Sequence, residues 1–369
     1  YYSKDNGSNY VESTSSSYTF SNLTSDATFY VKVYVKDSNN RDSSVSSTSV
    51  KTKIPRFDEI CNDNTLACHT AKLYTGTQGT NNIYYHDSKL LNGAGDNSYR
   101  FAGASESVNN YVCFGSTKTP CPENNLYRII GVFGDKVKLI KSDYATSALL
   151  GADGDYKDKY TTTESRYNWH NNYKENNLAN IAAYNWNKSN QNTWSTSLLN
   201  KTNLNKNFIT NIGADWAAKI ADTTWKVGGN TWANIANQPA KIAYQNEIVS
   251  PVTTNTTDNA TTYSAKVGLM YASDYGFAAA PSAWTANLNT YNGEAIKNLN
   301  WMYMGLVEWI ISRYADNSYN AFYVGGTGLL YIFDGVGETG LAVRPVFYLT
   351  SSVNYVSGDG TQNSPIRIN

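Results

Sequence analysis

The fold is decided first by residues 126–140, which read LYRIIGVFGDKVKLI. Two apolar runs, residues 126–133 and 136–140, flank the dipeptide Gly134-Asp135. A two-residue connection that contains glycine between two such runs is typical of a β-hairpin. This stretch therefore predicts two antiparallel strands joined by a tight turn.

Further strands are predicted in the last third of the chain. Residues 321–324, 329–333 and 341–349 are apolar runs separated by glycine-containing turns, and they predict a three-strand meander. Pro345 cannot donate a ladder hydrogen bond, so it should lie on an edge or at a bulge. The apolar residues 301–313 before the meander are expected to be buried.

Helical signals are confined to the middle of the chain. Ser195 or Thr196 is a candidate cap for a helix that carries Leu199 and Leu204, and residues 205–222 repeat apolar positions at spacings of three and four. Together with the strands, this predicts an α+β fold. Five tryptophans are expected to pack the core around these helices, with sugar stacking by one of them as the alternative: Trp186, Trp194, Trp216, Trp225 and Trp232.

Residues 1–53 read as short strands separated by polar turns. Residues 18–23 and 28–33 resemble the second half of a fibronectin type III or related immunoglobulin-like sandwich. The resemblance implies a partial, all-β, sandwich-type stalk domain that serves as a spacer, with ligand binding as the alternative. Since it covers about four of seven strands, the first strands are expected either to be missing or to lie upstream of Tyr1.

The length and the composition along the chain predict further division. A chain of 369 residues exceeds the roughly 250–300 residues that one hydrophobic core supports. Lys53-Ile54-Pro55-Arg56 marks a boundary, residues 54–125 are rich in loops, and residues 126–369 hold the strand and helix signals. We expect residues 54–125 to be a loop-rich extension of a larger domain at 126–369.

The charge balance excludes several classes of partner. Lys and Arg total 30, as do Asp and Glu, and charged residues are only 16% of the chain. A nucleic-acid binder or a polybasic membrane-surface protein would need a basic excess, so neither is expected. No apolar run approaches the roughly 20 residues of a membrane span, so membrane insertion is not expected. Low charge with 30 tyrosines and many Asn, Ser and Thr residues favours an extracellular, β-rich surface protein.

The four cysteines fall into two close pairs. Cys61 and Cys68 are seven residues apart, and Cys113 and Cys121 are eight apart, both wider than the usual spacing of zinc ligands. We expect two disulfides, Cys61–Cys68 and Cys113–Cys121, and therefore an oxidising exterior. Four free thiols in a cytosolic protein are the alternative.

Motifs of common enzymes and cofactor sites are missing from the sequence. It contains no HExxH, GxSxG, P-loop or GxGxxG string, so we expect no enzyme activity, no cofactor and no metal site. The closely spaced Asp153, Asp155 and Asp158 are interpreted as a solvated turn, with calcium binding as the alternative. Glu308 is interpreted as a buried carboxylate bonded to backbone or to Arg344, with a catalytic acid as the alternative.

Several segments together resemble a C-type-lectin-like domain of the branch shared with formylglycine-generating enzymes. They are the strand pair at 126–140, Trp194-Ser195-Thr196-Ser197-Leu198-Leu199-Asn200, Gly305-Leu306-Val307-Glu308-Trp309 and the ending at 343–349. The same branch includes Gram-positive surface proteins and the variable proteins of diversity-generating retroelements. In the latter, a reverse transcriptase randomises a C-terminal segment that the fold displays.

Residues 314–342 have the composition of such a display segment. They contain six glycines, six aromatics, three acids and no Lys or Arg, and tyrosine with glycine and asparagine is typical of adaptable binding surfaces. Alternation along the strands predicts Phe322, Val324, Leu330, Ile332 and Val343 in the core. The predicted ligand-binding residues are Tyr314, Tyr319, Tyr323, Leu329, Tyr331, Phe333, Asp334 and Glu338.

The favoured function is that of a non-enzymatic, bacterial cell-surface protein that binds a protein or glycan ligand through residues 314–342. A structural module without a variable site is the first alternative. An enzyme of the formylglycine-generating type is the second, but that family holds copper with a C-terminal cysteine pair, and the last cysteine here is Cys121.

Overall fold

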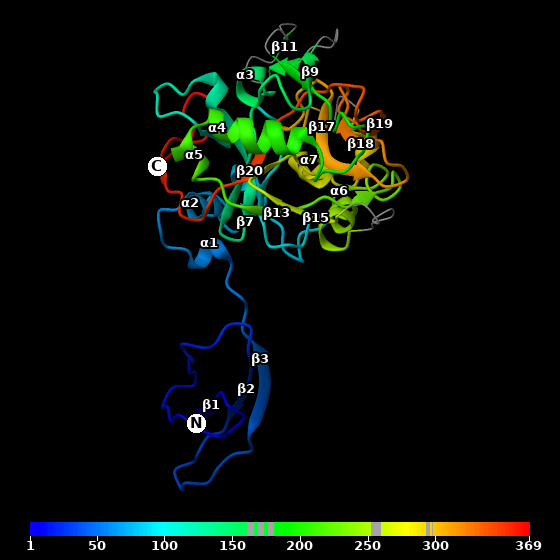
Figure 1. Ribbon diagram of the computed structural model, residues 1–369. Coiled ribbons are helices and arrows are strands. Elements are labelled where there is room, and N and C mark those ends of the chain that lie inside the picture. The colour runs from blue at the N-terminus through cyan, green and yellow to red at the C-terminus, as the bar shows by residue number, and fades with distance from the viewer. Residues whose placement is uncertain (161–165, 169–172, 176–180, 252–259, 293–295, 297) are drawn as a thin grey trace. The chain divides into compact units, whose positions relative to one another are not determined.

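A computed structural model describes residues 1–160, 166–168, 173–175, 181–251, 260–292, 296 and 298–369. The chain divides into two compact units, Tyr1–Cys61 and Asn62–Asn369 (Figure 1). Strands make up 27% of the structure and helices 19%, and the sheets are mostly antiparallel. The predicted α+β class is confirmed at this level.

The N-terminal unit, Tyr1–Cys61, contains a single three-stranded antiparallel sheet. Strands β1 (Tyr2–Ser3), β2 (Thr28–Val33) and β3 (Ser46–Lys51) pair in that order. Phe29, Val31 and Val33 lie on one face, as alternation requires, but each is only half-buried. Residues 1–61, all of which the structure describes, form no second sheet, so the sandwich-type architecture remains a prediction.

A seven-stranded sheet forms the centre of the C-terminal unit, Asn62–Asn369. Its order is β16-β20-β8-β7-β5-β4, and β6 also pairs with β7. The strands are β4 (Ile83–Tyr85), β5 (Tyr99–Phe101), β6 (Tyr111–Cys113), β7 (Leu126–Phe133), β8 (Lys136–Lys141), β16 (Val267–Gly268) and β20 (Val346–Tyr348). The predicted hairpin is confirmed, because Phe133 pairs with Lys136 across Gly134-Asp135.

Residues 54–125, expected to be loop-rich, contribute three strands to this central sheet. The pairing of β5 with β7 depends on Gly131, where β7 carries a register shift. A Cβ atom at Gly131 would lie 2.2 Å from the carbonyl oxygen of Tyr99, so only glycine lets the strands approach this closely.

Four charged side chains are enclosed between β5, β8 and helix α7 (Ala272–Ala278). Lys138 Nζ lies 2.5 Å from Asp274 Oδ2, and Arg100 lies 2.6 Å from Asp96 and 3.7 Å from Asp274. Burial lowers the pKa of the Lys138 amine, and Asp274 opposes this. Because the two cations and two anions neutralise one another, we interpret this cluster as a connection between elements.

A second sheet has the order β14-β17-β18-β19. It consists of β14 (Gly229–Asn230), β17 (Glu308–Tyr314), β18 (Asn320–Val324) and β19 (Leu330–Asp334). Figure 1 shows β18 and β19 on the side of the unit away from α4 (Ile209–Asn211) and α5 (Ala214–Ala217). Strands β17, β18 and β19 therefore form a meander. It begins one strand earlier in the chain than the predicted meander.

The prediction that residues 341–349 form the third strand of this meander is wrong. Residues 346–348 form β20, which pairs with β8 and β16 in the central sheet and does not continue from β19. Leu341 and Ala342 make isolated bridges to Tyr184 and Glu308. The apolar run 341–349 thus links the two sheets, because its local pattern is satisfied equally well by either one.

The predicted helical region begins later and is more broken than expected. Leu199 and Leu204 are buried, but the stretch begins after Ser197, whose hydroxyl accepts the Asn200 N–H at 3.2 Å, so neither Ser195 nor Thr196 caps it. The remaining helical turns are α1 (Phe57–Ile60), α2 (Leu66–Ala71), α3 (Ser147–Leu150), α6 (Ala240–Tyr244), π-helical η3 (Leu199–Phe208) and η4 (Gln245–Val249), and the 3-10 turns η1 (Thr80–Asn82), η2 (Glu123–Asn125), η5 (Pro281–Ala283) and η6 (Leu288–Thr290).

Among its described residues, the unit also contains four two-stranded sheets. They pair β9 (Tyr156–Lys159) with β12 (Ala182–Tyr184), β10 (Arg166–Asn168) with β11 (Tyr173–Glu175), β13 (Thr223–Lys226) with β15 (Thr262–Ala265), and β21 (Tyr355–Ser357) with β22 (Arg367–Ile368).

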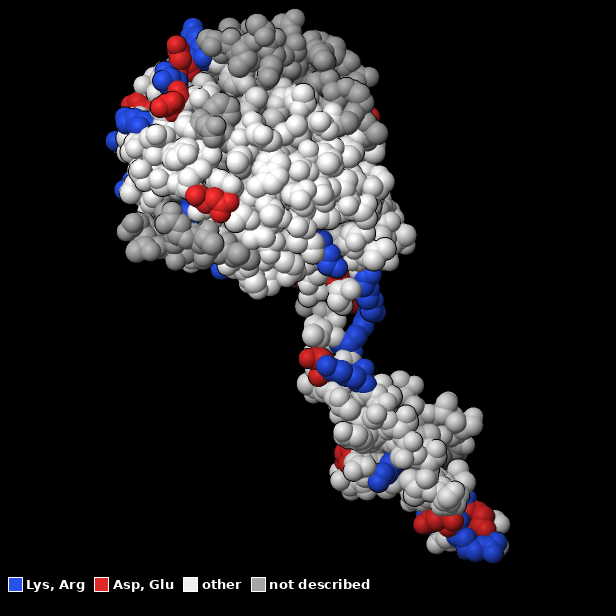
Figure 2. All heavy atoms as spheres, turned by 90° about the vertical axis from the view of Figure 1, so that its right-hand side faces the viewer, with Lys and Arg blue, Asp and Glu red and all other residues white. Residues whose placement is uncertain are grey.

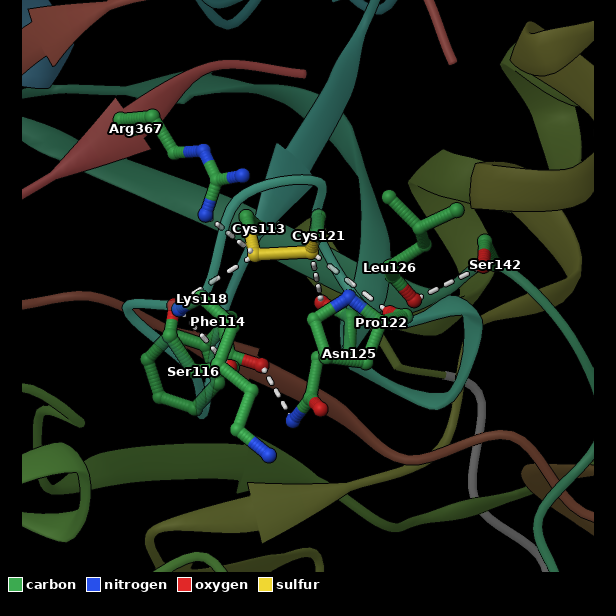
Figure 3. The surroundings of a disulfide bond; sticks show 10 residues. All are labelled: Cys113, Phe114, Ser116, Lys118, Cys121, Pro122, Asn125, Leu126, Ser142 and Arg367. Atoms are coloured by element: carbon green, nitrogen blue, oxygen red, sulfur yellow. Dashed lines mark hydrogen bonds between the residues drawn. A yellow bond between two sulfur atoms is a disulfide. The ribbon is translucent and has the colours of Figure 1, made fainter. Parts of the chain in front are cut away.

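The cysteine prediction is confirmed. Cys113 at the end of β6 is bonded to Cys121, with Cα atoms 5.9 Å apart (Figure 3). The Arg367 guanidinium from β22 donates to Cys113 Sγ at 3.1 Å. Cys61 and Cys68 are also disulfide-bonded, and none of the four cysteines is a free thiol.

Candidate functional site

A row of four aromatic side chains crosses the second sheet. The ring centroids of Trp309 on β17 and Tyr323 on β18 lie 6.4 Å apart. Tyr331 on β19 lies 6.0 Å from Tyr323 and 4.8 Å from Trp232, which follows β14. Trp309 is 1% exposed and Tyr331 is 46% exposed, so this aromatic row runs from the core to the surface.

Strand alternation explains why the row leaves the core. Tyr323 pairs with Tyr331 across the two strands, so both side chains lie on the same face. On the opposite face, Phe322, Val324 and Leu330 are buried, as predicted, whereas Ile332 is only half-buried.

The turn between β18 and β19 is anchored by the hydroxyl groups of two buried tyrosines. The hydroxyl of Tyr275 donates to the carbonyl oxygen of Gly328, and that of Tyr303 donates to Gly326, both at 2.6 Å. Both tyrosines are buried, so their hydroxyls hold the turn in a defined position. Leu329, beside this turn, is half-buried.

The loop between β17 and β18 is held by one buried amide. Asn192 Nδ2 donates to the carbonyl oxygens of Tyr314, Asn317 and Asn320 at 2.7, 2.9 and 2.7 Å. The backbone N–H of Asn192 donates to Ser318 at 2.6 Å. This asparagine therefore sets the path of the loop that carries Tyr319.

The loop after β19 rests on the same segment of chain. The N–H of Val336 donates to Tyr319 at 2.9 Å, and its carbonyl accepts the N–H of Asn187 at 3.2 Å. A Cβ atom at Gly337 would lie 2.8 Å from the backbone nitrogen of Asn190, so glycine is required for this contact. Both loops of residues 314–342 are thus preorganised on residues 187–192.

The predicted ligand-binding residues do not form one surface. Tyr323 and Tyr331 belong to the aromatic row, and Tyr319 and Glu338 are exposed on the two loops. Tyr314 lies toward Phe322 on the opposite face, and a hydrogen bond to Asp316 raises the pKa of its phenol to about 12. The side chains of Phe333 and Asp334 lie outside the described residues.

Trp232 belongs to this site but is not among the predicted ligand-binding residues; sugar stacking was only the alternative for it. It was expected in the core, but it is half-buried and contacts Tyr331. Trp216 is also half-buried, whereas Trp186, Trp194 and Trp225 are buried as predicted. No local signal distinguishes Trp232 from the other tryptophans, because its partner lies 99 residues further along the chain.

The surface around the row carries little charge. Figure 2 faces the side of the unit on which Figure 1 places β18 and β19, and uncharged atoms cover most of its described part. One acidic patch lies within this face, and the other charges gather near its rim. Such a surface offers little electrostatic steering to a charged partner.

Glu308 is paired as the sequence predicts. Arg344 donates to its two carboxylate oxygens at 2.5 and 2.7 Å, and both residues are nearly inaccessible to solvent. Burial raises the pKa of Glu308, and the Arg344 guanidinium opposes this. The bidentate geometry is that of a buried structural ion pair at the start of β17.

The three aspartates considered for calcium are occupied by protein donors or exposed. Asp155 is buried and accepts the N–H groups of Leu199 at 2.6 Å and Lys188 at 2.9 Å. Asp153 accepts the Asn207 amide, and Asp158 is exposed. Within the described ranges, no group of three or more His, Cys, Asp or Glu residues could hold a metal ion.

Comparison with known proteins places no family on this chain. No protein-family model, no curated protein and no solved structure matches it. In the part of the chain that the structure describes, no helix has the length and apolarity to cross a membrane.

Proposed function

We propose that this chain is a non-enzymatic, ligand-binding protein of the bacterial cell surface, whose C-terminal unit is a C-type-lectin-like domain. The ligand contacts the aromatic row and the adjoining loops of residues 314–342. The observation that carries this proposal is the exposure of Tyr331 beside Tyr323 and Trp232 on an anchored sheet. Exposed aromatic clusters on soluble proteins commonly mark interaction sites.

Three further features support this assignment. Rigid aromatic anchors contribute much of the energy of protein interfaces, and the loops around these rings are hydrogen-bonded in place. The disulfides are compatible with an oxidising exterior. The near-neutral surface fits a ligand that is recognised by shape and hydrogen bonds.

Binding can be tested on microarrays of purified extracellular proteins and of oligosaccharides. The Trp232→Ala/Tyr331→Ala double variant should bind every responding spot at least about tenfold more weakly than the unchanged chain, because aromatic anchors dominate interfaces. Tyr30→Ala is the matched control, since Tyr30 is 56% exposed but lies in the N-terminal unit. Binding that survives in the double variant would refute this surface.

The variable-protein proposal for residues 314–342 has a separate test. The gene neighbourhood should contain a reverse transcriptase and a near-copy of the coding segment for 314–342 that differs at adenines. A locus without both would leave a ligand-binding protein whose surface is not diversified.

A further inference from the structure

Amide side chains lie on two segments next to the aromatic row, the loop 231–238 and η6. The loop 231–238 holds Trp232 against Tyr331, and its other end pairs with η6, where Leu288 and Asn289 donate to the carbonyls of Gln238 and Ala236. Since η6 packs against β19, the loop and η6 together border the row.

This border is formed mainly by asparagine. The exposed Asn237 accepts from Asn287 at 3.2 Å and from Asn289 at 3.5 Å through its Oδ1 atom. These contacts do not use its Nδ2 group, which remains able to donate. Asn234, nearby in the same loop, is half-buried. We name Asn234, Asn237 and Asn287 the amide border; Asn289, whose Oδ1 atom is buried, is not part of it.

Neighbouring rings of the aromatic row are steeply inclined to one another and do not form a flat surface. The Trp232 and Tyr331 planes meet at 77°, and the Tyr323 and Tyr331 planes meet at 70°. A ligand seated here meets one ring face-on and the next edge-on. The matching ligand has flat apolar faces and polar edges in the same molecule.

Sugar rings have this combination of surfaces. Their C–H faces pack on aromatic rings, while their hydroxyls donate and accept hydrogen bonds around the edge. Asparagine amides also donate and accept, so an amide border can pair with hydroxyls without introducing charge. An anionic ligand would meet few cationic partners on this face, where the charged patch within it is acidic.

We infer that the ligand is an uncharged glycan, with sugar rings stacked on Trp232, Tyr331 and Tyr323 and hydroxyls bonded by the amide border. This inference rests on the proposed function and names its ligand class. Recognition proceeds through aromatic and amide groups alone, so binding is insensitive to ionic strength.

The first test uses a microarray of neutral glucose, mannose, galactose, xylose and N-acetylglucosamine oligomers beside sialylated and sulfated glycans. The chain should bind at least one neutral oligomer and should not prefer the charged glycans. Binding confined to charged glycans or to purified proteins would overturn the glycan assignment. If such protein binding is weakened by Trp232→Ala/Tyr331→Ala, the proposed function stands and only the inference fails.

The second test is calorimetric titration with the strongest neutral oligomer. Raising NaCl from about 50 mM to about 500 mM should change the dissociation constant less than about twofold, because no ion pair is screened. Trp232→Ala should weaken binding at least about tenfold, while Trp232→Phe, which keeps a ring, should stay within about threefold. Equal affinities for the two variants, or a strong salt dependence, would contradict the inference. Matching urea midpoints for both variants show that neither result reflects unfolding.

Discussion

At the scale of single residues, Phe322 and Tyr331 occupy opposite faces of the same strand pair. Phe322 is fully buried and Tyr331 is 46% exposed. Phe322→Ala should therefore lower the free energy of unfolding by about 3–5 kcal/mol, since it removes buried contacts and leaves a cavity. Tyr331→Ala should lower it by less than about 1 kcal/mol. Urea unfolding of the two variants checks this, and comparable losses would show that the faces are assigned incorrectly.

His86 makes stability depend on pH. It is fully buried, its Nδ1 accepts the Ala94 N–H at 3.0 Å, and its pKa lies well below the ordinary value of 6.5 because burial and Arg100 disfavour the imidazolium, against a smaller opposing effect of Asp96. The unfolded chain binds this proton first, so stability should fall as pH drops below about 6.5, by up to about 1.4 kcal/mol per pH unit.

The control for this pH effect is His86→Asn, which keeps an acceptor but does not titrate. Urea midpoints should be measured at about pH 7.5, 6.5 and 5.5. The midpoint should fall less steeply with decreasing pH in the variant than in the unchanged chain. The half-buried His69 is common to both proteins, so its contribution cancels. Parallel declines would assign the acid sensitivity to other groups.

At the scale of elements, Asn192 connects the segment 187–192 to the loop that carries Tyr319. Asn192→Asp preserves size but cannot donate, so carbonyls of Tyr314, Asn317 and Asn320 lose their partner. We expect a loss of about 1–3 kcal/mol in stability and faster amide exchange in residues 314–320. Hydrogen-exchange mass spectrometry checks the second effect. Unchanged exchange there would show that the loop is held by other contacts.

The Cys113–Cys121 bond closes a short loop between β6 and η2. Its sequence separation is 8, for which chain-entropy arguments give about 2.5 kcal/mol. The Cys113→Ala/Cys121→Ala variant should lose about this amount, measured by urea unfolding under oxidising conditions. Under reducing conditions the unchanged chain should lose stability while the variant, which no longer contains this bond, should lose less.

At the scale of the whole molecule, the two units differ in core. In Tyr1–Cys61 the one buried residue is Ser3, whereas the buried tryptophans and the apolar strands lie in Asn62–Asn369. Apolar burial is the main favourable term in folding, so the N-terminal unit should be the less stable. Amides of β2 and β3 should exchange completely under conditions in which those of β7 and β8 remain protected. Equal protection would contradict this ranking.

Features that depend on neighbouring residues could be predicted from the amino-acid sequence. Residues 126–140 contain the turn of their own hairpin, and the two cysteines of each pair are close in the sequence. Strand alternation assigns Phe322 and Tyr331 to opposite faces of the sheet. A buried Glu308 bonded to backbone or to Arg344 was also predicted, and the structure shows the pair with Arg344. These predictions succeed because the interactions concerned are formed between residues close in the sequence, or because few other partners are available.

Which distant elements meet could not be predicted and is known from the folded unit alone. The apolar pattern of residues 341–349 would suit a strand in either sheet. Residues 346–348 lie in the central sheet, where they pair with β8 on one side and β16 on the other. Trp232 became part of the aromatic row because the loop that carries it is hydrogen-bonded to η6, which packs against β19, although β14 itself lies at the opposite edge of the sheet. Strand pairing and ring contact between distant segments depend on competing surfaces over the whole unit, and no local sequence pattern records the outcome of that competition.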